Sequence, residues 1–372
     1  MRILFTTTPG RGHWQPMLPL ANALAADGHA VRWATAPEAC AALRERGFDV
    51  VPAGPAGLRM PAFPPEIAAL PPHERPNRFF GVLFGPRRAA PTLTDLLPIV
   101  EEWRPQLLVC EQAELAGPIA AACAGVPNAT HSFGRLLPEQ RVAGAAEAVA
   151  ELWQAQGLAP RPYAGTYDHL YVDIYPPGLQ AAELGHVGER QALRSVPPIA
   201  RDAATEPLVY ITFGTVFNDD IALFATAVEA ARELPVRVVV TLGPGNDAGA
   251  LGAQPPNVMV AEHVPQEQLL PACAVVLSHG GSGTFLGALA AGVPQLVVPL
   301  MADQYLNADA GAQGGVAVVV PREQASVATL RAALERILDD EAMRAAAGSV
   351  AAELAAMPAP EAAAAELARR FG

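Results

Sequence analysis

A glycine-rich segment in the second half of the chain has the composition of an anion-binding loop. It spans His279 to Thr284, reads His-Gly-Gly-Ser-Gly-Thr, and lies between the apolar run 275–277 and a small-residue stretch of helical composition. Glycines let the backbone approach a ligand closely, N–H groups at a helix start attract anions, and Ser and Thr hydroxyls add donors. A plain tight turn would have the same letters, so the neighbouring segments decide between the two interpretations.

Those neighbours carry polar side chains suited to a phosphorylated, hydroxyl-bearing ligand. Asp303 and Gln304 follow the apolar run 296–299, and both can form hydrogen bonds with hydroxyl groups. Gly214-Thr215 and the segment 263–266 each follow another predicted strand. Because the carboxyl ends of parallel strands meet at one edge of a sheet, we expect these loops to share one crevice.

The first half places a histidine after a similar loop. His13 follows Gly10-Arg11-Gly12 and an apolar run at residues 3–8, a position that also suits an anion contact or a helix cap. Glu111 follows the apolar run 107–110, where a carboxylate could fix the tautomer of a histidine that acts as a general base. Glu111 could instead cap the following helix, and Glu114 is the second candidate for the histidine's partner.

The elements that carry these residues predict an α/β fold. Apolar, β-prone runs alternate with helical segments in both halves, which is typical of parallel sheets. The tetrapeptide Ala-Gly-Val-Pro occurs at 124–127 and 291–294, each time between a predicted helix and a strand, as expected for a glycine at a helix C-terminus. We therefore predict two doubly wound, Rossmann-like domains that face a central crevice.

The composition suggests where the domains begin and end. We expect domains at 1–180 and 207–357, a Pro- and Gly-rich linker at 181–206, and a C-terminal helical segment at 358–372 that returns to the first domain. Residues 55–91 are rich in proline and have no clear period, so we expect an irregular loop there. Such a long loop is either functional, for example as the wall of a pocket, or a flexible surface insert.

Charge and composition exclude several functions. Of the 372 residues, 51% are hydrophobic and the net charge is −12, which indicates a packed globular protein that would repel nucleic acids. There is neither a membrane-span-length apolar run nor a signal-peptide pattern, so we expect a cytoplasmic protein. Its four cysteines are scattered and the chain has no Asp-x-Asp sequence, so we expect no metal site.

These motifs resemble the family-1 inverting glycosyltransferases of the GT-B fold, especially the bacterial branch that glycosylates natural products such as antibiotics and macrolides. The resemblance covers essentially the whole chain. It implies that the nucleotide-sugar pyrophosphate binds at the 279–284 loop, that Asp303 and Gln304 hold the transferred sugar, and that the 263–266 segment lies against the base. The implied donor-binding residues are Thr215, His263, Val264, Gln266, His279, Gly281, Ser282, Gly283, Thr284, Asp303 and Gln304.

The same resemblance implies roles in catalysis and acceptor binding. His13 would be the general base, Glu111 stands where the family commonly has Asp, and members generally need no metal ion. The acceptor would be a small, hydrophobic aglycone that carries a hydroxyl group. Candidate acceptor-binding residues are the aromatic side chains of Trp14, Phe63, Phe79, Phe80, Phe84 and Phe133.

One departure from the family bears on the donor. Many members have a glutamate that holds the ribose hydroxyls where this chain has Gly287, so we favour a dTDP-sugar over a UDP-sugar as the co-substrate. Two alternatives stay open at this point: a GT-B nucleotide-sugar epimerase, and a non-catalytic helper protein that binds nucleotide-sugars. The sequence also leaves the oligomeric state open, with a homodimer among the states considered.

Overall fold

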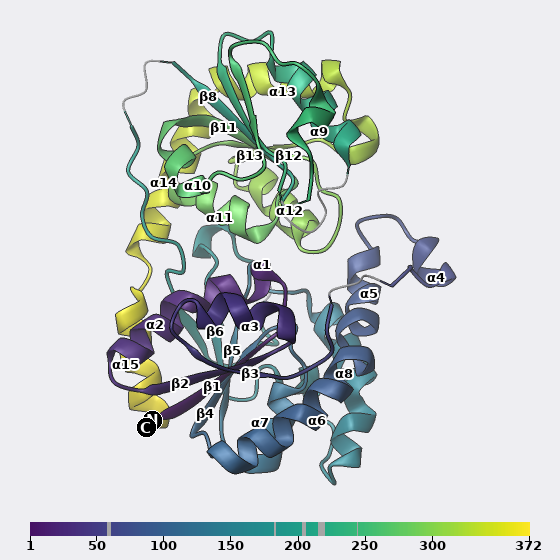
Figure 1. Cartoon of the computed structure of the whole chain (residues 1–372), viewed down its shortest axis with the longest axis vertical. Helices are drawn as coiled ribbons and strands as arrows, with labels where there is room; N and C mark the ends of the chain where they lie inside the picture. Colours follow the sequence, from purple (N-terminus) through teal and green to yellow (C-terminus); the bar gives the residue numbers. More distant parts are fainter. Residues whose placement is uncertain (58–60, 182–183, 203–205, 215–219, 244) are drawn as a thin grey trace. The chain divides into compact units, whose positions relative to one another are not determined.

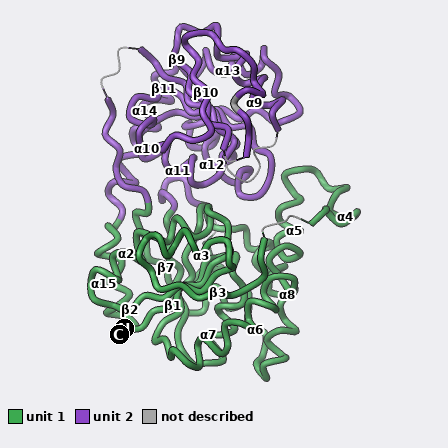
Figure 2. Tube along the Cα trace, viewed as in Figure 1, with its two compact units in different colours: residues 1–174, 181–195, 358–372 green, residues 175–180, 196–357 purple. Residues whose placement is uncertain are grey.

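The computed structural model describes residues 1–57, 61–181, 184–202, 206–214, 220–243 and 245–372. The chain forms two compact units (Figure 2). Unit 1 consists of Met1–Ile174, Ala181–Ser195 and Pro358–Gly372, and unit 2 consists of Tyr175–Gln180 and Val196–Met357.

Unit 1 is built on a seven-stranded sheet in the order β3-β2-β1-β4-β5-β6-β7, in which all neighbours run parallel. Its strands are β1 (Arg2–Thr7), β2 (Ala30–Thr35), β3 (Asp49–Pro52), β4 (Leu107–Glu111), β5 (Asn128–His131), β6 (Leu170–Asp173) and β7 (Arg190–Ala192). Ile3 of β1 pairs with Leu107 of β4, and both side chains are fully buried. Central parallel strands are covered on both faces, so they need apolar side chains throughout.

The helices of unit 1 are α1 (Arg11–Trp14), α2 (Leu18–Ala26), α3 (Pro37–Arg44), α4 (Pro65–Ala68), α5 (Arg75–Phe84), α6 (Pro86–Trp103), α7 (Gly117–Ala124), α8 (Glu139–Ala155) and α15 (Pro360–Phe371). Of these, α2, α3 and α7 pack against strands of the sheet, whereas α4 packs against α5. Helix α15 comes from the C-terminus of the chain and packs along α2 (Figure 1). Both termini of the chain therefore belong to unit 1.

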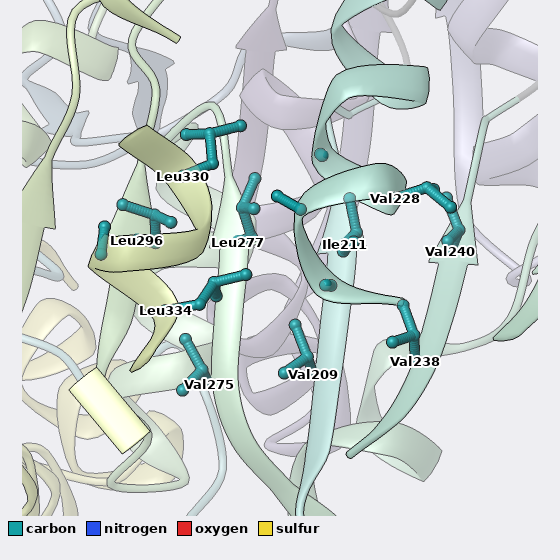
Figure 3. Close-up of a cluster of buried hydrophobic side chains, with 14 of the residues drawn as sticks. Val209, Ile211, Val228, Val238, Val240, Val275, Leu277, Leu296, Leu330 and Leu334 are labelled. Carbon is teal, nitrogen blue, oxygen red and sulfur yellow. The ribbon is translucent and has the colours of Figure 1, made fainter. Parts of the chain in front are cut away.

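Unit 2 has a six-stranded parallel sheet in the order β10-β9-β8-β11-β12-β13. The strands are β8 (Leu208–Thr212), β9 (Arg237–Thr241), β10 (Val258–Ala261), β11 (Cys273–Ser278), β12 (Gln295–Val297) and β13 (Ala317–Val319). The helices are α9 (Ile221–Ala231), α10 (Gln266–Leu269), α11 (Ser282–Ala290), α12 (Gln304–Gln313), α13 (Val327–Asp339) and α14 (Glu341–Ala356). Valines and leucines of β8, β9 and β11 form a core with α9 and α13 (Figure 3).

The strand order places a topological switch point at the centre of each sheet. In unit 1 the connections diverge between β1 and β4, and in unit 2 between β8 and β11. Loops that leave the carboxyl ends of such adjacent strands diverge to opposite faces of the sheet, which opens a ligand-binding crevice between them. The predicted α/β class with two doubly wound units is confirmed.

Two predictions about the segments between these elements are wrong. Residues 181–195 are not linker, because β7 pairs with β6 and extends the sheet of unit 1, whereas 175–180 belongs to unit 2. The segment 55–91 is not irregular throughout, because it contains α4, α5 and the start of α6. Pro65, Pro76 and Pro86 lie in the first turns of these helices, where the missing N–H group has no intrahelical partner to lose. Pro91 lies inside α6.

The two glycines of the repeated Ala-Gly-Val-Pro sequence end their helices as predicted. Gly125 follows α7 with φ of 66°, and Gly292 follows α11 with φ of 64°. Only glycine adopts this left-handed conformation without strain. In the part of the chain that the structure describes, no helix has the length and apolar character needed to cross a membrane.

Candidate active site

His13 and Glu111 lie together at the switch point of unit 1. His13 is in α1, just after β1, and Glu111 is the last residue of β4. The Nδ1 atom of His13 is 3.0 Å from Oε2 of Glu111; the imidazole is 20% exposed and the carboxylate is fully buried. Glu111 is held in turn by the backbone N–H of Ala113, which donates to Oε1 at 2.7 Å. At this distance the carboxylate favours the tautomer with the proton on Nδ1, which leaves Nε2 to accept one.

Glu114, the second candidate for the partner of His13, binds the backbone instead. Its carboxylate accepts hydrogen bonds from the backbone N–H groups of Ala116 and Gly117, at 2.8 and 2.9 Å, and so caps the start of α7. Burial raises the pKa of this carboxyl group above its ordinary value. The structure thus brings Glu111 to His13 and gives the capping role to Glu114.

Aromatic side chains surround the His13 imidazole. The ring centroids of Phe133 and Phe84 lie 5.1 and 5.7 Å from that of His13, and Phe80 is 4.9 Å from Phe84. All three phenylalanines are at most 9% exposed. Three of the six aromatic acceptor candidates are therefore grouped with His13, in a setting that suits an apolar ligand.

The other three candidates make different ring contacts. Phe63 and Phe79 pack edge to face with each other, with ring centroids 4.6 Å apart. Trp14 is only 4% exposed, and the Arg46 guanidinium lies 5.2 Å from its ring centroid. Trp14 is thus buried to about the same degree as the three phenylalanines.

Arg88 of α6 lies in a pocket next to Phe84 and was not among the residues singled out from the sequence. It lines a small pocket in unit 1 together with Thr8, Phe84, Thr92 and other residues. Its Nη2 atom donates to the carbonyl of Gly57 at 2.8 Å, and burial lowers its pKa below the ordinary arginine value. Nothing in the sequence marked it, because a lone arginine on a helix is most often a surface residue.

In unit 2, His279 fills a slot between two glycines. A Cβ atom at Gly214 would lie 2.7 Å from the His279 Nε2 atom, and one at Gly281 would lie 2.8 Å from it. His279 is 8% exposed, and burial lowers its pKa from 6.5 to about 4 despite the nearby Asp303. At neutral pH it is therefore a neutral imidazole that can donate a hydrogen bond, and not a cation.

The N-terminus of α11 follows directly. Ser282 is its first residue, and the Asp303 carboxylate accepts hydrogen bonds from the Ser282 N–H at 3.1 Å and hydroxyl at 2.5 Å, both on Oδ2. Gly283 is exposed and Thr284 is half-buried on the same first turn. Predicted donor residues from the two segments 279–284 and 303–304 are thus brought together at this helix end.

Gln304 holds the loop that follows β12. Its Oε1 atom accepts hydrogen bonds from the N–H groups of Leu300 and Met301 at 2.7 and 2.9 Å, and the residue is only 2% exposed. Ala302 in this loop has φ of 59°, a left-handed conformation that costs free energy in any residue except glycine. The side-chain oxygen of Gln304 is therefore occupied by hydrogen bonds within the loop. Its NH₂ group is the part suited to a ligand.

Helix α10, which follows β10, meets α11 through Gln266. Its Nε2 atom is 3.4 Å from the Gly283 carbonyl, and a Cβ atom at Gly287 would lie 3.0 Å from it. The absence of a side chain at Gly287 thus makes room for Gln266. His263 is exposed and Val264 half-buried, and Thr215 lies outside the described residues.

Two domain models of one family match the chain. The model for Erythromycin biosynthesis protein CIII-like, N-terminal domain, matches residues 78–171, and the model for its C-terminal domain matches 225–369. The elloramycin glycosyltransferase ElmGT of Streptomyces olivaceus is 33% identical over 400 residues, which cover 100% of this chain and 98% of that protein. The chain is a natural-product glycosyltransferase of this family.

Solved structures agree with this assignment. This glycosyltransferase resembles the spinosyn rhamnosyltransferase SpnG complexed with thymidine diphosphate, with a TM-score of 0.83, 28% identity, and coverage of 99% and 100% of the two chains. It also resembles the glycosyltransferase VinC in complex with dTDP, with a TM-score of 0.81, 26% identity and 99% coverage of each chain. The expected GT-B fold is confirmed.

The described residues of this glycosyltransferase contain no group of three or more His, Cys, Asp and Glu placed to hold a metal ion. They do contain two buried residues beside the 279–284 loop, Tyr175 and Asn307, that the sequence analysis missed. Hydrogen bonds connect them to that loop, and no pattern in the sequence predicts these bonds.

Proposed function

We propose that this glycosyltransferase moves a sugar, preferably a deoxysugar, from a dTDP-sugar to a hydroxyl group of a small hydrophobic aglycone, with inversion at the anomeric carbon. The observation that carries the proposal is the 3.0 Å pair of His13 and Glu111 among aromatic side chains. A hydroxyl group is a poor nucleophile at neutral pH, and a histidine oriented by a carboxylate is the group that can take its proton.

In the proposed reaction, Nε2 of His13 accepts the proton of the acceptor hydroxyl as its oxygen bonds to the anomeric carbon. The bond from that carbon to the donor phosphate breaks, and dTDP leaves with the electron pair. The buried carboxylate of Glu111 stabilises the imidazolium that forms. Attack from the face opposite the leaving group inverts the configuration.

The departing diphosphate needs positive potential. We assign this task to backbone N–H groups and the Thr284 hydroxyl at the start of α11, with neutral His279 as a further donor. The Ser282 hydroxyl already donates to Asp303. This set of donors supports transfer without a metal ion. Asp303 and the Gln304 NH₂ group are assigned to the sugar hydroxyls.

The preference for dTDP has two supports. VinC and SpnG are both described with thymidine diphosphate. In addition, the position of the family's ribose-binding glutamate is Gly287, so this chain lacks a carboxylate there for the 2′-hydroxyl of a uridine nucleotide. The neighbouring Gln266 amide is assigned to the nucleoside.

Calorimetry with dTDP and UDP in the presence of EDTA tests the donor site. We expect the wild type to bind dTDP more tightly than UDP without metal, and His279→Ala to lose most of this affinity. His263→Ala, an exposed position outside the 279–284 loop, should weaken binding less. Failure of the wild type to bind either nucleotide would overturn the proposal, and tight binding only after Mg²⁺ is added would remove its metal-independent part.

A further inference from the structure

A buried asparagine connects the two parts of the proposed donor site in unit 2. The Nδ2 atom of Asn307, in α12, donates to the Gly280 carbonyl at 2.8 Å and to the Ser282 hydroxyl at 3.0 Å, and lies 3.4 Å from Asp303 Oδ2. On its other side, the Tyr175 hydroxyl donates to Asn307 Oδ1 at 3.0 Å. Asn307 is completely buried and Tyr175 is 1% exposed.

These partners determine the orientation of the amide. The Gly280 carbonyl only accepts hydrogen bonds, so it must face the NH₂ group of Asn307 and not its oxygen. The Tyr175 hydroxyl supplies the donor that the oxygen needs on the opposite side. An aspartate at position 307 would have the same size, but its ionised carboxylate could donate to none of the three acceptors.

Tyr175 is held independently of this hydroxyl group. Its ring stacks on Phe285 of α11, with centroids 6.5 Å apart and planes 5° from parallel. Tyr175 begins the short segment Tyr175–Gln180 that belongs to unit 2, although the preceding residues of the chain belong to unit 1. The tyrosine thus anchors this segment to α11 and α12.

We propose that Asn307 is a positioning residue for donor binding: it fixes the anion-binding turn Gly280–Ser282 and the Asp303 carboxylate in one arrangement, and Tyr175 sets the orientation of its amide. This inference rests on the proposed function. The arrangement matters because one donor must meet both groups at a fixed separation, its phosphates at α11 and its sugar at Asp303. All the contacts described above use Oδ2 of Asp303, and none of them uses Oδ1.

The test compares Asn307→Asp and Tyr175→Phe with wild type by calorimetry in EDTA, using dTDP and thymidine as probes. Asn307→Asp removes the donors and adds a negative charge at the helix N-terminus, so dTDP affinity should fall at least about tenfold. Thymidine has no phosphate, so its affinity should change less than about twofold. Tyr175→Phe keeps the ring stack and should lower dTDP affinity about threefold.

Asn257→Asp is the matched control. Asn257 is also in unit 2 and donates to two backbone carbonyls, those of Arg232 and Val236, but it precedes β10 at the opposite edge of the sheet. It should lose thermal stability without loss of dTDP affinity. Unchanged dTDP binding by Asn307→Asp, or equal losses for dTDP and thymidine, would overturn the inference while the proposed function stands. A wild type that binds no dTDP overturns both.

Discussion

Unit 1 sets His13 beside the buried carboxylate of Glu111 and leaves a fifth of the imidazole exposed, whereas unit 2 seals His279 between two glycines, where burial lowers its pKa to about 4. Both histidines follow a strand at a switch point of a parallel sheet. A carboxylate partner and solvent access suit a group that gains and loses a proton, whereas burial that outweighs the nearby Asp303 suits a neutral donor. The environment, and not the residue type, separates the proposed base from the proposed donor contact.

The largest expected effect comes from removing the proposed base. His13→Ala should lower the turnover number about 10³-fold with an acceptor found by screening, because proton removal from the hydroxyl is then unassisted. Its dTDP affinity, measured by calorimetry, should match wild type. His29→Ala is the control, since His29 also lies near a carboxylate, with Nε2 3.5 Å from Asp27 Oδ2. Equal turnover of His13→Ala and wild type would contradict the assignment of His13 as the base, and with it the contrast between His13 and His279.

Acid should lower the stability of the protein because two buried histidines are neutral in the folded state. Burial lowers the pKa of His131 and of His279 from 6.5 to about 4, so the unfolded chain binds more protons between these values. Protonation of the unfolded chain therefore lowers the free energy of unfolding as the pH falls from 6.5 toward 4. The expected decrease is about 2 kcal/mol for each histidine between pH 7 and 5. Urea unfolding at pH 7 and pH 5 measures this decrease in the free energy of unfolding. It should be smaller in His131→Gln and in His279→Gln than in wild type, and it should equal that of wild type in the exposed-site variant His73→Gln.

The slot around His279 can be tested with a single methyl group. Gly281 has φ of −61°, so alanine suits its backbone, but the new Cβ would lie 2.8 Å from the His279 Nε2 atom. We expect the ring to shift and dTDP affinity to fall about tenfold. Gly348→Ala in α14 is the matched control, because a Cβ there meets nothing within 4 Å. Wild-type affinity in Gly281→Ala would show that the slot has no role in binding.

The smallest effect is expected from the aromatic neighbours of His13. Phe133→Leu should raise the acceptor KM about three- to tenfold, because less apolar surface covers the ligand, and should leave dTDP affinity unchanged. Phe48→Leu removes a ring that packs on Trp33 instead, and its acceptor KM should not change. A KM change of the same size in both variants would point to loosened packing of unit 1 and not to acceptor contact.

Features with local causes were predictable from the sequence. The glycine-rich loops, the apolar strands and the helix-ending Gly125 and Gly292 follow from short-range patterns, and the structure has them. The resemblance to the family favoured Glu111 as the partner of His13, and the structure has this pair. The structure also shows that Glu114 instead caps α7.

The rest depends on contacts between distant segments. The strand β7 has only three residues, and it is a strand because β6 offers a free edge. Pro65, Pro76 and Pro86 favoured a loop at 55–91 in the sequence, but in the structure each lies in the first turn of a helix. The hydrogen bond from Tyr175 to Asn307 spans 132 positions, beyond the range of any periodicity.

The division of the chain between the units decides where related enzymes can be recombined. A chimaera that exchanges donor specificity at a single breakpoint near residue 195 would keep segment 175–180 of one parent with the second unit of the other. It would also carry over a foreign α15, which packs on α2 of unit 1. An exchange that respects the fold takes 175–180 and 196–357 together and leaves the C-terminal helix with its original partner.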